Sequence, residues 1–218
     1  IVLRLAPTFL RFGSFEIFKG RDARTGRVGP SSGNVALLGR MLEYACRHFF
    51  PNAVAAGPEG SKARYLALYK EAVRSTAELV AAWQCVGFTH GVLNTDNMSL
   101  LGLTIDYGPY GFMDFYDPAF VPNGSDSGGR YSYEKQPEVC KWNLVKFAEA
   151  LAPVLPLADS EQALSEYDNI FQAYYEGGMR RKLGLVVEDD RDGQLFESLF
   201  DVMAETSADF TNTFRELS

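Results

Sequence analysis

The sequence has few of the side chains that build most metal sites and disulfides. Its 218 residues include three cysteines and two histidines. The cysteines form no C-x-x-C pair, and the histidines are too scattered for a zinc site of ordinary ligand spacing. We therefore expect neither a disulfide framework nor a zinc centre, and a reduced compartment fits this use of cysteine.

Long apolar runs and an excess of positive charge are also missing. Arg, Glu or Asp interrupts every apolar stretch before it reaches the roughly 18 to 20 residues of a membrane-spanning helix, so we expect no membrane span. The 21 basic and 28 acidic residues give a net charge of −7. This balance argues against binding nucleic acid through a broad basic face. A bound phosphate must instead be held by a few local groups.

The remaining composition is that of a globular domain. Hydrophobic residues make up 46% of the chain, which is enough to bury a core, and the length predicts one domain. The sequence begins at Ile1 without Met or a basic and apolar leader, and it stops at Ser218 directly after a helix-like stretch. These ends predict a fragment of a longer protein.

Apolar periodicity predicts a mainly α-helical fold with one small β-hairpin. Asn34 should cap a helix that Pro51 closes, and the strongest helix should run from Ser61 to about Val86, where Gly87 ends it. We expect further helices at about 137–152, 160–181 and 192–215, the hairpin within 98–106 around Gly102, and probable loop insertions at 19–33 and 51–60. Core and lobe packing should involve Trp83, Trp142 and the aromatic stretch 107–120, and Cys85 and Cys140 should be buried.

One segment carries a pattern with chemical meaning. A long helix is followed by a polar loop with Asp and Asn, a short apolar strand, and a second strand that ends in Ile-Asp-aromatic-Gly. Kinase-like phosphotransferases use this arrangement to bind metal and ATP. Because Mg²⁺ prefers oxygen ligands in octahedral geometry, Asn97 and Asp106 can bind it while phosphates and waters complete the shell. Gly108 would let the chain turn behind the carboxylate.

The usual catalytic base of such a loop is missing. Small-molecule kinases with this arrangement typically have H-G-D-x-x-x-x-N, with the Asp as base. Here the spacing from His90 to Asn97 is kept, but Val92 stands in the place of that Asp. Asp96 is the only carboxylate left in the loop, which indicates either an inactive kinase or a reaction with another proton acceptor. We interpret His90 as structural.

Three stretches together resemble the selenoprotein O family, also called the YdiU family. They are RLAPTFLRFGSFEIF at 4–18, HGVLNTDNMSLLGLTIDYGPYGFMDFYDP at 90–118 and GRYSYEKQPEVCKWNL at 129–144. The resemblance implies a protein-kinase-like fold that is formally a pseudokinase, binds ATP in a flipped orientation, and transfers AMP to Ser, Thr or Tyr hydroxyls of proteins. Residues 1–218 would then be its C-terminal-lobe portion, with an N-terminal lobe before Ile1 and a C-terminal extension after Ser218.

The resemblance also implies roles for individual residues. Asp96 matches the proton acceptor of the family. Asn97 and Asp106 match its Mg²⁺ ligands, with Mn²⁺ as an alternative ion, and Asp106 also lies close to the nucleotide. Arg4 and Arg11 match two arginines that hold the terminal phosphates of the inverted ATP.

Two other functions stay open at this point. One is a phosphorylating kinase of unusual loop chemistry, and the other is a catalytically inactive nucleotide-binding module. The resemblance favours a mitochondrial location, with the cytoplasm as the alternative. The protein targets and the oligomeric state are not predicted.

Overall fold

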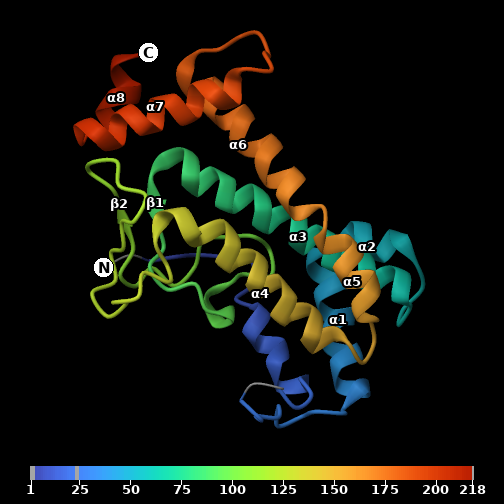
Figure 1. Cartoon of the computed structure of the whole chain (residues 1–218). Helices are drawn as coiled ribbons and strands as arrows, with labels where there is room; N and C mark the ends of the chain where they lie inside the picture. The colour runs from blue at the N-terminus through green and yellow to red at the C-terminus, as the bar shows by residue number, and fades with distance from the viewer. Residues whose placement is uncertain (1–2, 23–24, 218) are drawn as a thin grey trace. The chain divides into compact units, whose positions relative to one another are not determined.

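The computed structural model describes residues 3–22 and 25–217 and shows a mainly helical chain with one small sheet (Figure 1). Two compact units form. Unit 1 comprises the described residues up to Thr76 together with Asn94–Asp106 and Cys140–Tyr167, and unit 2 comprises Ala77–Leu93, Tyr107–Val139 and the described residues from Asp168 onward. The elements are η1 (Phe12–Phe18), α1 (Val35–Phe49), α2 (Pro51–Ala56), α3 (Lys62–Val86), β1 (Phe88–Thr89), η2 (Thr95–Asn97), β2 (Gly111–Phe112), η3 (Tyr133–Lys135), α4 (Gln136–Leu151), α5 (Leu157–Leu164), α6 (Tyr167–Leu183), α7 (Asp192–Thr206) and α8 (Phe210–Glu216).

The first long helix begins as its sequence predicts. The side-chain oxygen of Asn34 accepts a hydrogen bond from the Leu37 amide at 3.1 Å, which satisfies one of the unpaired amides of the first turn of α1. The expectation for 51–60 is wrong in its first half, because residues 51–56 form α2. Pro51 occupies the first turn of that helix, where the missing amide hydrogen costs nothing. The described residues of 19–33 form turns as expected, and residues 23–24 of that stretch lie outside the described part.

Helix α3 is the long buried helix that the periodicity predicts. The Ser61 hydroxyl accepts a hydrogen bond from the Arg64 amide at 3.3 Å at its start, and Gly87 follows its end with a left-handed φ of 67°. Buried side chains recur every three or four residues along it, namely Arg64, Tyr65, Leu68, Tyr69, Ala72, Val73, Thr76, Ala77, Val80, Ala81, Trp83, Gln84 and Cys85. The buried Arg64 is compensated by Glu43, at 2.6 Å.

The predicted hairpin within 98–106 is wrong. The two strands are β1 and β2, which pair antiparallel with Phe88 opposite Phe112. In the stretch 98–106, Met98, Leu100 and Ile105 are buried, but the two halves of the stretch do not pair with each other as strands. Gly102 adopts a left-handed φ of 63° there, and a Cβ on it would lie 2.7 Å from the Cβ of Ser75. The apolar pattern therefore reflects burial around a tight turn, which short apolar runs do not distinguish from a strand.

Two predicted helices are each broken in two. The stretch 160–181 contains the end of α5 and most of α6, and 192–215 contains α7 and most of α8. Ser207 ends α7 with a left-handed φ of 51°, and the Asp209 carboxylate then caps α8 by accepting from the Asn212 amide at 2.7 Å. The break lets α8 fold back, so that Phe210 stacks near Phe200 at 6.3 Å between ring centroids.

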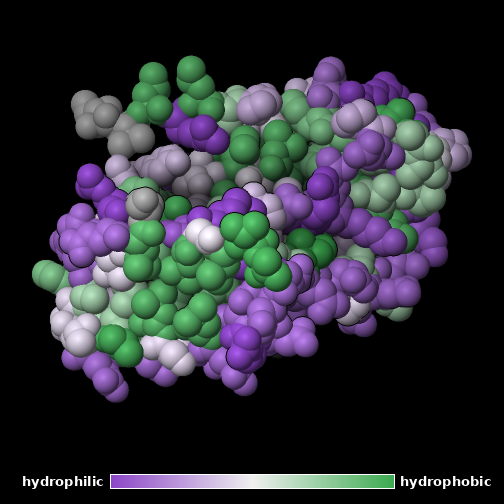
Figure 2. Space-filling model, turned by 90° about the horizontal axis from the view of Figure 1, so that it is seen from above, coloured by the Kyte–Doolittle hydropathy of each residue, from purple (hydrophilic) through white to green (hydrophobic). Residues whose placement is uncertain are grey.

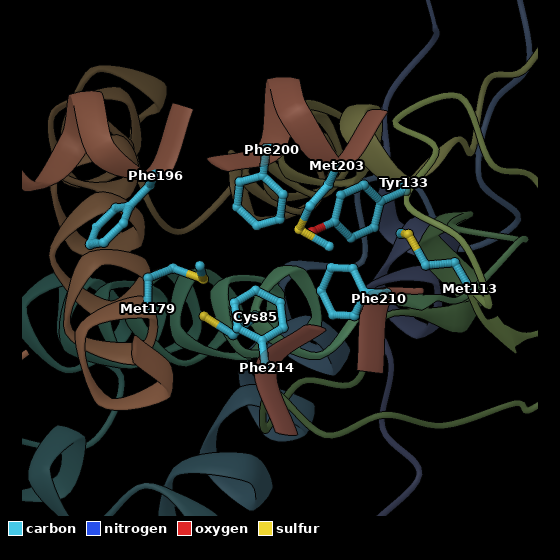
Figure 3. Packing of buried hydrophobic residues seen from close by; sticks show 9 residues of the cluster. All are labelled: Cys85, Met113, Tyr133, Met179, Phe196, Phe200, Met203, Phe210 and Phe214. Carbon is cyan, nitrogen blue, oxygen red and sulfur yellow. The ribbon is translucent and has the colours of Figure 1, made fainter. Parts of the chain in front are cut away.

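The core of unit 2 is rich in sulfur and aromatic side chains (Figure 3). Its cluster of buried residues comes from α3, η3, α6, α7, α8 and the residue after β2, and consists of Cys85, Met113, Tyr133, Met179, Phe196, Phe200, Met203, Phe210 and Phe214. All three cysteines are buried and none forms a disulfide; burial was expected for Cys85 and Cys140, and Cys46 is the third.

The face in Figure 2 shows hydrophilic residues around patches of hydrophobic ones. Among the helices of the described residues, none is both long and apolar enough to cross a membrane.

Candidate active site

The polar turn that carries Asp96 is a single turn of 3-10 helix, η2. The Asn97 amide donates to the Asn94 carbonyl at 2.9 Å, and the Met98 amide donates to the Thr95 carbonyl at 3.4 Å. Leu93 and Met98 on either side are 0% and 2% exposed, so both ends of the turn are anchored in apolar surroundings. The Asp96 side chain is exposed, and it forms no hydrogen bond or ion pair with any described residue. Its carboxylate is therefore open to a ligand.

Asp106 is held by Arg11 across 95 residues of sequence. The Arg11 guanidinium donates through Nη2 to Oδ1 at 2.9 Å and to Oδ2 at 2.8 Å, and through Nε to Oδ2 at 3.0 Å. The side chains are 31% and 35% exposed, so the pair lies at the surface of unit 1. Asp106 itself has a left-handed φ of 53°, while Ile105 before it is fully buried. A left-handed backbone is unusual for a residue other than glycine, so this conformation marks Asp106 as a constrained position.

Arg4 lies on the same segment as Asp106. Its Nε donates to the Thr104 carbonyl at 3.0 Å, two residues before Asp106. Arg4 thus binds the backbone of Thr104, and Arg11 binds the side chain of Asp106 two residues later. Arg4 also lines a cavity of about 430 Å³ whose other lining residues include Arg74 and Glu71. In the structure, both predicted phosphate-binding arginines therefore contact the segment 104–106, which contains the predicted metal ligand Asp106.

Backbone hydrogen bonds join the Arg11 segment to the residues that follow the Asp96 turn. The Phe12 amide donates to the Met98 carbonyl at 3.0 Å, and the Leu100 amide donates to the Leu10 carbonyl at 2.9 Å. Between these bonds Arg11 lies opposite Ser99 in an isolated antiparallel bridge. All five predicted site residues belong to unit 1, namely Arg4, Arg11, Asp96, Asn97 and Asp106.

The predicted magnesium ligands have suitable donor chemistry. Asp106 offers a carboxylate and Asn97 an amide oxygen, and hard oxygen donors are the ligands that Mg²⁺ prefers. No group of three or more His, Cys, Asp or Glu side chains suited to a metal occurs in residues 3–22 and 25–217. A site here would therefore need phosphate or water oxygens to complete its shell.

Several residues near this region have structural roles. His90 is 1% exposed, its amide donates to Gln136 Oε1 at 2.9 Å, and its Nδ1 accepts from the Val92 amide at 3.4 Å. Gln136 in turn donates through Nε2 to the Phe88 carbonyl at 2.9 Å. The interpretation of His90 as a structural residue agrees with this network, and Gln136, which the sequence did not single out, holds it.

Trp142 does not pack in the core, because this side chain is 44% exposed. It lies on the surface of α4 and lines a cavity of about 560 Å³ together with Glu16, Asn94 and Thr95. Trp83, by contrast, is 5% exposed and packs in the core as expected. The cavity adjoins the Asp96 turn, because Asn94 and Thr95 line it. A periodic pattern in the sequence could not reveal that these two residues lie beside a cavity.

Comparison with known proteins identifies the family. A family model described as protein adenylyltransferase SelO matches residues 1–218. The human mitochondrial protein adenylyltransferase SelO is 58% identical over 220 residues, covering 100% of this chain and 33% of the human protein. Zebrafish mitochondrial SelO-1 is 55% identical over 219 residues (100% of this chain, 32% of the relative), and mouse mitochondrial SelO is 55% identical over 222 residues (100% and 33%). The chain thus spans about a third of the length of these relatives. It belongs to the SelO family of protein adenylyltransferases.

Proposed function

We propose that this chain is part of an enzyme that transfers AMP from ATP to Ser, Thr or Tyr hydroxyls of other proteins and releases pyrophosphate. The observation that carries the proposal is a pair of contacts within unit 1. The Arg11 side chain binds the Asp106 carboxylate, and backbone hydrogen bonds join the segment around Arg11 to the residues that follow the Asp96 turn. The names of the relatives, all protein adenylyltransferases, support it.

The two arginines would bind the terminal phosphates of ATP. A guanidinium is planar and always charged, so it binds phosphate oxygens through paired hydrogen bonds. A chain with a net charge of −7 needs such fixed positive groups to attract a polyanion. In the structure Arg11 is neutralised by Asp106, and phosphate oxygens offer its guanidinium the same bidentate geometry.

Asn97 and Asp106 would hold Mg²⁺, with Mn²⁺ as an alternative ion. When bound, the ion supplies positive charge that lowers the cost of bringing phosphates together and of releasing pyrophosphate. The contribution of the chain itself is to fix these two donors, since the hydrogen bonds of the Asp96 turn hold the backbone of Asn97 and the Arg11 guanidinium holds the Asp106 carboxylate.

Asp96 would accept the proton in the transfer step. The hydroxyl oxygen of the acceptor forms a bond to the α-phosphorus, and the bond from that phosphorus to the oxygen bridging to the β-phosphate breaks. Pyrophosphate leaves with the electron pair, and the hydroxyl proton passes to the Asp96 carboxylate. An exposed carboxylate without a partner among the described residues is accessible for this role.

We also propose that the fold is the C-terminal lobe of a protein-kinase-like domain and that the enzyme works in mitochondria. A mainly helical chain with one small antiparallel sheet is compatible with such a lobe. The mitochondrial location rests on the names of the three relatives.

ATP labelled at either the α- or the γ-phosphate tests the reaction. The natural full-length protein is incubated with Mg²⁺ and each labelled ATP, and protein-bound label is measured. We expect label from the α position only, and we expect Asp96→Asn to reduce it strongly, while the exposed Asp190→Asn leaves it unchanged. Label from the γ position alone would indicate a phosphorylating kinase, and no label from either would indicate an inactive nucleotide-binding module.

A further inference from the structure

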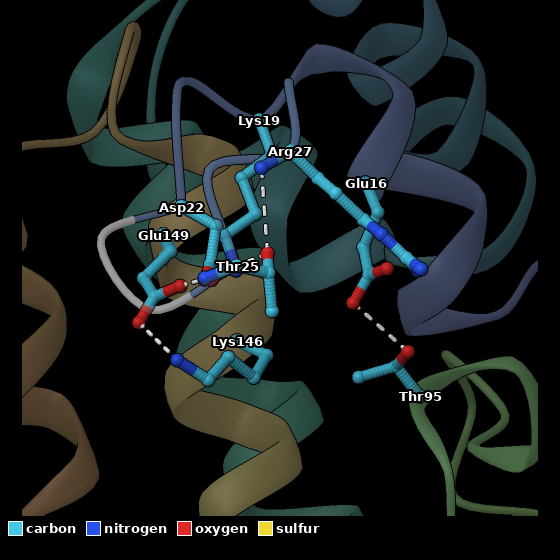
Figure 4. A network of polar contacts seen from close by, with 8 residues as sticks. All are labelled: Glu16, Lys19, Asp22, Thr25, Arg27, Thr95, Lys146 and Glu149. Carbon is cyan, nitrogen blue, oxygen red and sulfur yellow. Dashed lines mark hydrogen bonds and ion pairs between the residues drawn. The ribbon is translucent and has the colours of Figure 1, made fainter. Parts of the chain in front are cut away.

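Helix η1 contacts the Asp96 turn at two points that the proposed function does not use, and Figure 4 shows the first of them, between Glu16 and Thr95. The Thr95 hydroxyl donates to Glu16 Oε1 at 2.9 Å. At Gly13, an added Cβ would lie 3.0 Å from both the Cα and the amide nitrogen of Asp96. The backbones of Gly13 and Asp96 are therefore packed so closely that even a methyl group would force one of them to move.

Helix η1 is itself firmly held inside unit 1. Phe12, Phe15 and Phe18 are at most 2% exposed. Phe12 stacks on Phe147 of α4 with 4.9 Å between ring centroids, and Phe15 meets the same ring edge-on at 5.1 Å. Three aromatic anchors on one short helix leave it little freedom to shift.

Charged side chains extend this attachment on the polar side. Lys19, directly after η1, pairs with Asp22 at 3.2 Å and with Glu149 at 2.6 Å. Lys146 pairs with the same Glu149 at 2.6 Å, so the end of η1 is tied to α4 through a shared carboxylate (Figure 4). The helix that touches the Asp96 turn is therefore fixed at both its apolar and its polar side.

We propose that η1 is the positioning element of the AMP-transfer site. Glu16, acting through the Thr95 hydroxyl, and Gly13, acting through backbone contact, set the position of the Asp96 carboxylate, while Arg11 at the start of the same helix holds Asp106. The inference rests on the proposed function. It assigns Gly13, Glu16 and Thr95 as positioning residues that touch no reacting atom.

The position of Asp96 must come from its backbone. Its exposed side chain has no partner among the described residues that could orient it. A proton acceptor works only within hydrogen-bond reach of the hydroxyl, about 2.6 to 3.2 Å. A displacement of about 1 Å at a reacting group can lower the rate about 100-fold. Loosening either contact of η1 should thus affect turnover more than nucleotide binding.

Matched substitutions in the natural full-length protein test this. Thr95→Val keeps the shape of the side chain but removes the hydroxyl, Thr95→Ser keeps the hydroxyl, and Gly13→Ala adds the methyl that has no room. Gly128→Ala is the control, because a Cβ there meets nothing within 4 Å. We expect Thr95→Val and Gly13→Ala to lower kcat about 10- to 100-fold with KM for ATP changed less than about two-fold. Thr95→Ser and the control should retain the wild-type kcat.

Hydrogen exchange of the amides of residues 94–98 provides a readout that does not depend on activity. Exchange at the Asn97 and Met98 amides should quicken in Thr95→Val and Gly13→Ala and stay unchanged in Gly128→Ala. Wild-type exchange together with wild-type kcat in the first two variants would overturn the proposal. If the wild type transfers no AMP, the proposed function fails, while faster exchange would still support the bracing of the turn and unchanged exchange would refute it.

Discussion

Replacing Asp106 with asparagine separates the chemistry of this residue from its place in the fold. With a φ of 53°, Asp106 lies in the left-handed region. Asn enters this region readily, whereas a residue such as Ala loses about 1 to 2 kcal/mol there. Asp106→Asn therefore removes the negative charge without adding backbone strain. Asp106→Ala removes the charge and also adds the strain.

The structure sets the expected size of each effect. The Arg11–Asp106 pair is about one-third exposed on each side, so solvent screens it, and its loss should cost about 0 to 1 kcal/mol of unfolding free energy. Asp106→Ala adds the strain, for a total of about 1 to 3 kcal/mol. At about 2 to 4 °C per kcal/mol for a chain of this size, Tm should fall by at most about 4 °C for Asn and up to about 12 °C for Ala. AMP transfer should fall at least about 100-fold in both, because both lose the anionic metal ligand.

Thermal unfolding of the 218-residue chain and transfer of α-labelled AMP by the natural full-length protein, each with the same substitutions, check these values. Asp190→Asn is the control for the loss of one exposed negative charge. Wild-type transfer by Asp106→Asn would refute the role of the carboxylate as a ligand. Equal Tm values for Asp106→Asn and Asp106→Ala would refute the argument from backbone strain, and a large loss of stability in Asp106→Asn would show that the pair is not screened.

Three further predictions concern buried groups. Burial lowers the pKa of Lys182 to about 8, although the nearby Cys85 opposes the shift. At Lys182 the unfolded chain then binds more protons than the folded one between pH 8 and 10.5, so this residue alone contributes a rise in stability with pH of about 1 to 3 kcal/mol. In urea unfolding, the difference in stability between the wild type and Lys182→Met should change by this amount across that range. Arg64→Met strands the buried Glu43 carboxylate and should cost about 3 to 5 kcal/mol at neutral pH, and a loss below about 1 kcal/mol in denaturant titrations would contradict the pairing. Burial raises the pKa of Cys46 to about 12 and that of Cys85 to about 11, so a thiol reagent should label these cysteines only after unfolding. Rapid labelling of the native protein would argue against their burial.

The long helices could be predicted because their apolar positions and caps are local. Asn34, Ser61 and Gly87 end or begin helices through contacts within a few residues. The sequence does not predict the breaks before α6 and after α7, because the apolar pattern continues across them. After α7, the break lets Phe210 pack near Phe200, a tertiary contact that no local pattern encodes. The hairpin was misplaced because burial and strand pairing give the same short apolar runs.

The candidate site was predictable in its residue types but not in its contacts. Asp96, Asn97 and Asp106 are close in sequence and carry a recognisable spacing. The pairing of Arg11 with Asp106 closes 95 residues, and the bond of Thr95 to Glu16 closes 79, so no local pattern encodes either. Exposure of Trp142 was missed for a related reason, since a cavity formed by separate segments leaves no periodic signal in any one of them.

The discontinuity of unit 1 also has a consequence for how the protein is made. The unit begins before Arg11 and is complete only with Tyr167. At about 5 to 20 residues per second, a ribosome needs roughly 10 to 30 s to synthesise the chain between these points. Until Phe147 of α4 has been synthesised, Phe12 and Phe15 of η1 lack the ring that they pack against in the folded unit. We therefore expect the nascent chain to expose these rings long enough for chaperones to bind them, and the candidate site to form only after α4 has been synthesised.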